Sequence, residues 1–235
     1  MYYVALIAVA SSLMQFLLLP VYIRLKKRQK YLPLKMTIKG LMTFIAFGFA
    51  LYAVLVLRHR TGSFFELVTE SGMKTHILLP VGIFICMVAD VVLCVEFKIG
   101  MLLFLAGHIC YSAYFLIIGG FNPVSVVLFV ISATAITLYF GRYTRKEGKM
   151  FILYTVYGIM ISITLATGLV LPFSIREYGV MPAISSVLLV VSDVMLGMNK
   201  VRKTKMIADL QYLGYYFSGQ FVLALSIFVP AVLGV

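Results

Sequence analysis

Two aspartates stand inside apolar stretches of this chain. Asp90 lies within MVADVVLCVEF, residues 87–97, and Asp193 lies within VLLVVSDVMLG, residues 187–197. A charged side chain near the centre of a membrane helix costs about 2.5–3.5 kcal/mol on insertion scales, so it usually faces a cavity or a partner. Two such carboxylates can perform acid–base chemistry on a substrate, or can carry protons during coupled transport.

Other polar residues are expected at a similar depth in the membrane. They lie in three further apolar segments, and they are Lys39, His108, Tyr216 and Gln220. Tyr216 precedes Gln220 by one helical turn, so both share a face. Asp90 and Asp193 could simply be structural partners of the lysine or the histidine, and the residues alone leave that alternative open.

Long apolar helices must position these residues. The chain has 235 residues, of which 63% are hydrophobic and 12% are charged, whereas about 25% charged residues are usual in a soluble domain. Apolar runs of about 20 residues recur throughout, which predicts an all-α, polytopic membrane bundle. It forms a single integral membrane domain over residues 1–235, and we expect its first segment to be a retained helix. Eight transmembrane helices are predicted, approximately 2–23, 37–57, 76–95, 98–118, 123–140, 149–171, 180–199 and 211–233.

The basic residues predict the orientation of the bundle. Of the 20 lysines and arginines, 15 lie in the odd-numbered connections between predicted helices and four lie in the even-numbered ones. Because positive loops stay in the cytoplasm, both termini are predicted on the non-cytoplasmic side. The net charge of +12 therefore favours contact with anionic lipid headgroups at the cytoplasmic face, and not with nucleic acid.

Several enzyme classes are excluded by their motifs. Intramembrane aspartyl proteases pair a Tyr-Asp with a Gly-x-Gly-Asp, whereas Ala89 and Ser192 precede the two aspartates here. Among the three histidines only His108 is placed deep in a segment, and the three cysteines fall in apolar runs, so we expect neither a metal nor another cofactor. A retinal pigment would need a lysine deep in a late helix, and the last two predicted helices have none.

Three ordered blocks carry a resemblance to a known family. They are GIFICMVADVVLCVEFKIGMLLFLAGHICYSAYF (82–115), SSVLLVVSDVMLGMNK (185–200) and YYFSGQFVLALS (215–226). The first resembles an Asp-containing helix followed by a Gly-x-x-x-Phe … His-x-x-Tyr helix, the second a Ser-Asp block, and the third a Tyr-Tyr-x-x-x-Gln ending. Together they resemble the YhhN/transmembrane-protein-86 family, the lysoplasmalogenases. The family's Lys-Pro pair is replaced by Lys39-Gly40, with Lys35 as a rival for the lysine position.

This resemblance implies hydrolysis of the vinyl-ether bond of a lysophospholipid substrate, a lysoplasmalogen with a choline or ethanolamine headgroup, to release a fatty aldehyde. A protonated carboxylic acid suits protonation of the vinyl β carbon, and an ionised carboxylate suits stabilisation of the resulting cation. Asp90 and Asp193 are thus expected to be the catalytic pair, with either one as the acid. The expected supporting residues are Lys39, His108, Tyr111, Ser192, Tyr215, Tyr216 and Gln220.

Two functions of other classes remain open from the residues. A proton-coupled small-molecule or lipid transporter could use the same two aspartates as a protonation switch, and a structural or regulatory bundle could use them only to join helices. In every case we expect a multi-pass protein of the plasma membrane or, in a eukaryote, of the endoplasmic reticulum. A lipid substrate would enter sideways from the cytoplasmic leaflet.

Overall fold

The structure is a computed structural model that describes residues 2–26, 31–61, 74–145, 148–202 and 206–233, and every element in these ranges is helical. The long helices are α1 (Tyr2–Lys26), α2 (Leu32–Thr61), α4 (Lys74–Val92), α5 (Phe97–Gly119), α6 (Pro123–Thr144), α7 (Lys149–Leu169), α9 (Val180–Arg202) and α10 (Met206–Leu233). A short helix, α8 (Leu171–Ile175), and the 3-10 turn η3 (Arg176–Gly179) connect α7 to α9.

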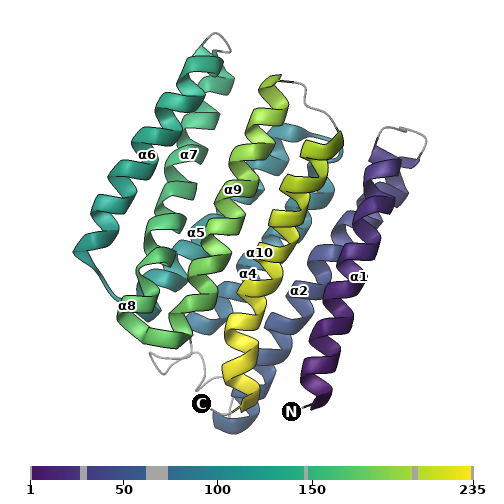
Figure 1. Cartoon of the computed structure of the whole chain (residues 1–235), viewed down its shortest axis with the longest axis vertical. Coiled ribbons are helices and arrows are strands. Elements are labelled where there is room, and N and C mark those ends of the chain that lie inside the picture. Colours follow the sequence, from purple (N-terminus) through teal and green to yellow (C-terminus); the bar gives the residue numbers. More distant parts are fainter. Residues whose placement is uncertain (1, 27–30, 62–73, 146–147, 203–205, 234–235) are drawn as a thin grey trace.

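The long helices lie side by side along one axis (Figure 1). Helix α10 packs against α1, α2 and α9, while α5 packs against α4 and α7, and α6 lies at the edge of the bundle against α7. Helix α1 begins and α10 ends at the same end of the bundle (Figure 1). The faces of α2, α4, α5, α7, α9 and α10 therefore meet in a common interior, where the candidate site lies.

All eight predicted segments are helical, but most of the helices are longer than the predicted spans. Helix α2 covers 32–61 instead of 37–57, and α10 begins at 206 instead of 211. The apolar run measures only the length that lipid requires, whereas the backbone hydrogen bonds continue into the polar ends. Helix α4 ends early, at Val92, because the chain turns at once into α5, where the Glu96 side chain accepts a hydrogen bond from the Lys98 backbone N–H at 3.3 Å.

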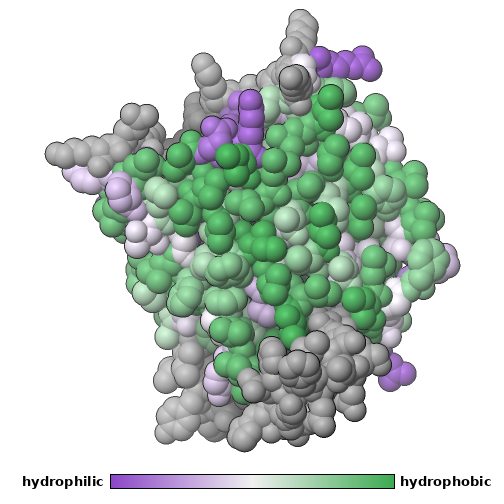
Figure 2. Space-filling model, turned by 180° about the vertical axis from the view of Figure 1, so that it is seen from behind, coloured by the Kyte–Doolittle hydropathy of each residue, from purple (hydrophilic) through white to green (hydrophobic). Residues whose placement is uncertain are grey.

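Five stretches of the described residues are long and apolar enough to cross a membrane. They are Leu32–Leu57, Phe97–Gly119, Pro123–Thr144, Met150–Lys200 and Asp209–Val229. The fourth stretch includes both α7 and α9, and two shorter apolar helices cover Val9–Leu25 and His76–Val92. The surface agrees with a membrane protein, because Figure 2 shows a mostly hydrophobic face with hydrophilic side chains gathered near its ends. Several of the loop lysines and arginines counted above, such as those of 27–30 and 203–205, lie outside the described residues.

Helix α4 approaches α5 closely at Gly82. A Cβ atom added there would lie 2.6 Å from Cε1 of Tyr111, whereas one added at Gly48 of α2 would meet nothing within 4 Å. We expect Gly82→Ala to lower the free energy of unfolding by about 1–3 kcal/mol through overpacking. The matched change Gly48→Ala should be neutral or stabilising, because alanine favours a helix by about 1 kcal/mol over glycine. Thermal unfolding in detergent measures both, and equal effects would contradict the close approach.

Candidate functional site

Asp90 of α4 is fully buried and surrounded by donors from two other helices. The Lys39 ammonium lies 2.9 Å from Oδ1, and Oδ2 accepts hydrogen bonds from the hydroxyls of Thr43 and Tyr216, the latter at 2.8 Å. Lys39 and Thr43 are one turn apart on α2, so both reach the same carboxylate. An ammonium and two hydroxyl donors are partners that suit an ionised carboxylate.

Asp193 of α9 is paired with His108 of α5. The His108 Nε2 atom lies 2.8 Å from Oδ2 of Asp193, and both side chains are buried. Tyr157 of α7 lies beside Asp193, and its ring stands edge-on to His108 with centroids 6.0 Å apart. The arrangement joins α5, α7 and α9 around one carboxylate.

The second ring nitrogen of His108 faces two hydroxyl groups. Nδ1 lies 3.1 Å from the hydroxyl oxygen of Thr164, and that oxygen also lies 2.9 Å from Ser112 Oγ and 3.2 Å from the Met160 carbonyl oxygen. When Thr164 donates to Met160, its oxygen can accept from an Nδ1–H group, and the hydrogen bond between Nε2 and Asp193 then needs one further proton, carried by either residue. A carboxyl group and an imidazole joined in this way can act as a general acid or base.

Tyr111 of α5 connects to the last helix through Gln220. Its hydroxyl donates a hydrogen bond to Oε1 of Gln220 at 2.7 Å, and both side chains are buried. The Tyr111 ring also stands edge-on to His108, with ring centroids 5.8 Å apart. Tyr111 and Gln220 thus tie α5 to α10 beside the Asp193 pair.

Removing this hydrogen bond has a predictable cost. We expect Tyr111→Phe to lower the free energy of unfolding by about 1–3 kcal/mol, because the buried Gln220 amide oxygen loses its donor. Thermal unfolding is the measurement. Tyr139→Phe on the exposed side of α6 is the matched control and should leave the midpoint unchanged. A midpoint for Tyr111→Phe equal to that of the control would contradict the role of Tyr111.

The two carboxylates do not hydrogen-bond to each other. Each has its own basic partner, Lys39 for Asp90 and His108 for Asp193. The two aspartates thus have separate partners, and their joint role as a catalytic pair stays a prediction. Helix packing decides the partners, because α5 and α7 supply the partners of Asp193 while α2 and α10 supply those of Asp90.

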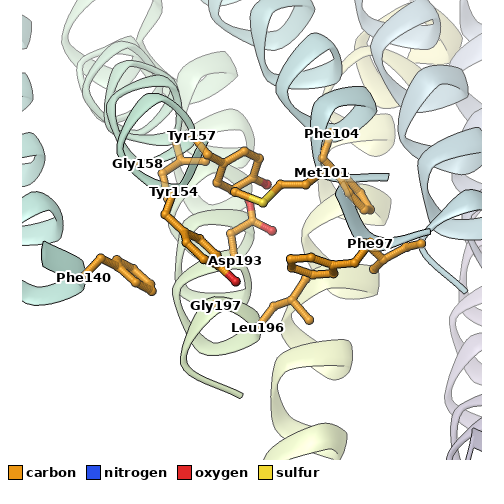
Figure 3. Close-up of a pocket in the computed structure, with 12 residues that line it drawn as sticks. Phe97, Met101, Phe104, Phe140, Tyr154, Tyr157, Gly158, Asp193, Leu196 and Gly197 are labelled. Carbon is orange, nitrogen blue, oxygen red and sulfur yellow. The ribbon is translucent and has the colours of Figure 1, made fainter. Parts of the chain in front are cut away.

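An apolar pocket opens onto Asp193 (Figure 3). Its empty volume, counting space open to the outside, is about 440 Å³. The lining residues are Leu93, Phe97, Met101, Phe104, Phe140, Tyr154, Tyr157, Gly158, Ile161, Asp193, Leu196 and Gly197. Asp193 is the one charged member of this lining. A carboxylate on the wall of an aromatic and aliphatic pocket is suited to act on an apolar ligand.

The structure buries most of the predicted site residues in the interior of the bundle, but not Tyr215. It brings Lys39, His108, Tyr111, Tyr216 and Gln220 into the interior with the two aspartates. Lys39, and not Lys35, reaches Asp90, and Ser192 is buried beside Asp193 on α9. Tyr215 is 41% exposed, so it points away from the cluster that Tyr216 enters.

Three residues of the site were not predicted from the sequence. Thr43 contacts Asp90, Thr164 contacts His108, and Tyr157 lies beside Asp193. Thr43 follows Lys39 by one turn, and Tyr157 and Thr164 are two turns apart on α7. Their spacing on a shared face was the available signal.

One of three comparisons with known proteins identifies a family. A sequence model of the YhhN family matches residues 34–227. The match runs from the start of α2 into α10 and so includes every residue of the Asp90 and Asp193 clusters. No curated protein and no solved structure matches the chain.

Proposed function

This chain belongs to the YhhN family, and from that premise we propose that it is a lysoplasmalogenase, a hydrolase of the vinyl-ether bond of lysoplasmalogens. Its products are a fatty aldehyde and glycerophosphocholine or glycerophosphoethanolamine. The observation that carries the proposal is the carboxylate of Asp193, which lies on the wall of a largely apolar pocket and is hydrogen-bonded to His108 behind it. An apolar alkenyl chain suits the lining, and the reaction needs a proton at that chain's vinyl-ether end.

The chemistry requires one proton donor and one water molecule. The Asp193–His108 pair gives its shared proton to the β carbon of the vinyl ether, and the former π electrons form the new C–H bond. The α carbon and the ether oxygen then share a positive charge. Water adds to the α carbon and returns a proton to the pair. The hemiacetal then collapses: its hydroxyl group loses its proton as the C=O bond forms, the bond to the glycerol oxygen breaks, and that oxygen takes up a proton to become the glycerol hydroxyl.

The site supports different roles for the two aspartates. Asp193 lines the pocket, so its carboxylate can contact substrate and stabilise the cation after proton transfer. Asp90 is absent from this lining and is held by Lys39, Thr43 and Tyr216. Asp90 therefore acts as a positioning residue that fixes Lys39 and Tyr216. Tyr216 in turn packs edge-on against Phe104 of the pocket, with centroids 5.6 Å apart.

The eight long helices all cross the bilayer in this proposal, with both termini on the non-cytoplasmic side. The basic connections, which lead into α2, α5, α7 and α10, then face the cytoplasm. Lysolipid enters from the cytoplasmic leaflet. Cysteine labelling of Lys98→Cys from the cytoplasmic side tests this orientation, since Lys98 is exposed at the start of α5. Labelling only from the opposite side would show that the bundle has the reverse orientation in the membrane.

The first experiment compares hydrolysis with transport. Purified protein in detergent is given a lysoplasmalogen, and an ester-linked lysolipid of the same chain length serves as the control substrate. We expect aldehyde and the glycerophospho-headgroup in equal amounts from the first and no cleavage of the second. Movement of lysolipid in sealed vesicles without aldehyde release would instead support the transporter that the buried ion pairs also allow.

A further inference from the structure

A second pocket adjoins the apolar one at the end of the bundle where α2 begins and α9 ends. Its empty volume, counting space open to the outside, is about 650 Å³. Three lysines line it, Lys35 and Lys39 from α2 and Lys200 from α9, together with the tyrosines Tyr22 and Tyr212. No carboxylate belongs to this lining. The pocket is thus lined by cations and hydroxyl donors, which is the composition that an anion requires.

Lys35 is the residue that points to a ligand. Its side chain is only 8% exposed, and no carboxylate pairs with it among the described residues. Burying an ammonium without an anionic partner is costly, so a buried lysine is normally paired. Lys39 differs, because it already has Asp90 as a partner at 2.9 Å. A bound anion would supply the partner that Lys35 lacks.

Lys200 closes the other side of this basic pocket. Its ammonium lies 4.2 Å from the centroid of the Phe97 ring, a cation–π contact that directs it toward the start of α5. Lys35 and Lys200 come from helices that are far apart in the sequence. Cations from two helices around one cavity favour a bound anion over a chance patch of basic surface.

The basic and the apolar pockets share a wall. Leu93, Phe97 and Leu196 line both of them. An amphiphile with an anionic group close to an apolar chain can therefore occupy both pockets across this wall. In a lysoplasmalogen only the short glycerol bridge separates the phosphate from the vinyl ether. With the phosphate in the basic pocket, the vinyl ether lies near the wall and Asp193 lies in the pocket beyond it.

We propose that the basic pocket is the phosphate subsite of the enzyme, with Lys35 and Lys200 as the residues that bind the phosphate diester of a lysophospholipid. This inference rests on the proposed function for the identity of the lipid. Lys39 stays with Asp90 and forms the boundary between the phosphate and the interior. The bound phosphate thereby sets how deeply the alkenyl chain of the lipid enters the apolar pocket. This depth decides which bond of the lipid faces Asp193.

The test measures binding with probes that cannot be hydrolysed. They are 1-O-hexadecylglycerophosphocholine, a saturated ether lysolipid, and 1-O-hexadecylglycerol, which has the same chain without the phosphate. Affinities are measured in a nonionic detergent for wild type, Lys35→Gln and Lys35→Arg. We expect Lys35→Gln to bind the phosphate-bearing probe about tenfold more weakly, because one charge-assisted hydrogen bond is lost. Lys35→Arg keeps a cation and should restore most of the affinity.

The matched control is Lys98→Gln, which removes one exposed lysine at the same end of the bundle and outside both pockets. It should bind both probes as wild type does. If Lys35→Gln fails to fold, Lys200→Gln is measured in its place with the same expectation. Unchanged affinity for the phosphate-bearing probe, or an equal loss for both probes, would overturn the subsite.

Inorganic phosphate separates the two possible sources of the anion. We expect it to compete poorly with the lysolipid, because it gains nothing from the apolar pocket. If phosphate binds and the lysolipid does not displace it, the pocket serves a free anion and the proposal is wrong. Because these probes are not cleaved, binding without lysoplasmalogen hydrolysis would overturn only the proposed function. Hydrolysis with unchanged binding in Lys35→Gln would overturn only the subsite.

Discussion

Asp193→Asn is expected to reduce the rate of aldehyde release by about 10²–10⁴-fold while leaving the fold intact. The amide has the shape of the carboxyl group and can still form a hydrogen bond with His108 Nε2, which lies 2.8 Å from Oδ2 in the wild type. It cannot donate the shared proton to carbon, nor can it carry the negative charge that stabilises the cation. The rate is measured at saturating lysoplasmalogen, and folding is checked by thermal unfolding.

Asp209→Asn is the matched control for this change. Asp209 lies in the first turn of α10, where its carboxylate accepts a hydrogen bond from the Asn199 amide at 3.3 Å, outside the lining of the apolar pocket. The same loss of charge there should leave the rate close to that of wild type. A folded Asp193→Asn protein with the wild-type rate would remove Asp193 from the chemistry.

Lys39→Met is expected to have the largest effect on stability. Removing one member of a buried ion pair leaves the other charge without compensation, which costs about 3–5 kcal/mol. Asp90 is fully buried, and within the described part of the chain its Oδ1 atom accepts no hydrogen bond that could replace the Lys39 contact. The chain supplies its own reporter, because Cys86 is buried in the folded state and reacts with a thiol-specific dye on unfolding.

The double variant Lys39→Met/Asp90→Asn tests the cause of that loss. It removes both charges, while the amide oxygen of the introduced asparagine can still accept hydrogen bonds from the Thr43 and Tyr216 hydroxyls. We expect it to be more stable than Lys39→Met alone. The single variant Asp90→Asn completes the cycle, and the departure of the double variant from the sum of the two single changes is the coupling between the two residues. Asp90→Asn could instead destabilise the Lys39→Met protein as much as it destabilises wild type. In that case the broken ion pair does not explain the instability of Lys39→Met.

The positions of the helices were predictable because the bilayer fixes the length of an apolar run. The hydrogen-bond partners of the buried polar side chains were harder to predict. Thr164 illustrates the reason, since a threonine in an apolar helix often bonds only to its own backbone, as Thr155 does with the Phe151 carbonyl. The spacing of Thr164 and Tyr157 places both on one face of α7, but it does not show whether such a threonine bonds only to its own helix or also contacts the buried His108.

Adjacent tyrosines illustrate a second limit. Tyr215 and Tyr216 belong to the same sequence block, but one residue turns an α-helix by about 100°. Tyr216 therefore reaches Asp90 while Tyr215 remains 41% exposed. The rotation of α10 depends on its packing against α2 and α9. That packing, and the separate partners of the two aspartates, follow from the tertiary structure and not from local pattern.

The most direct test of the proposed reaction is hydrolysis of a lysoplasmalogen by the purified protein in D₂O, followed by mass spectrometry of the aldehyde. Protonation of the β carbon predicts one deuterium on the carbon next to the carbonyl in each product molecule. Rapid reduction of the aldehyde to the alcohol, with unlabelled aldehyde incubated in parallel, corrects for later exchange. Aldehyde without deuterium beyond that control, or no aldehyde at all, would contradict hydrolysis by proton transfer to carbon.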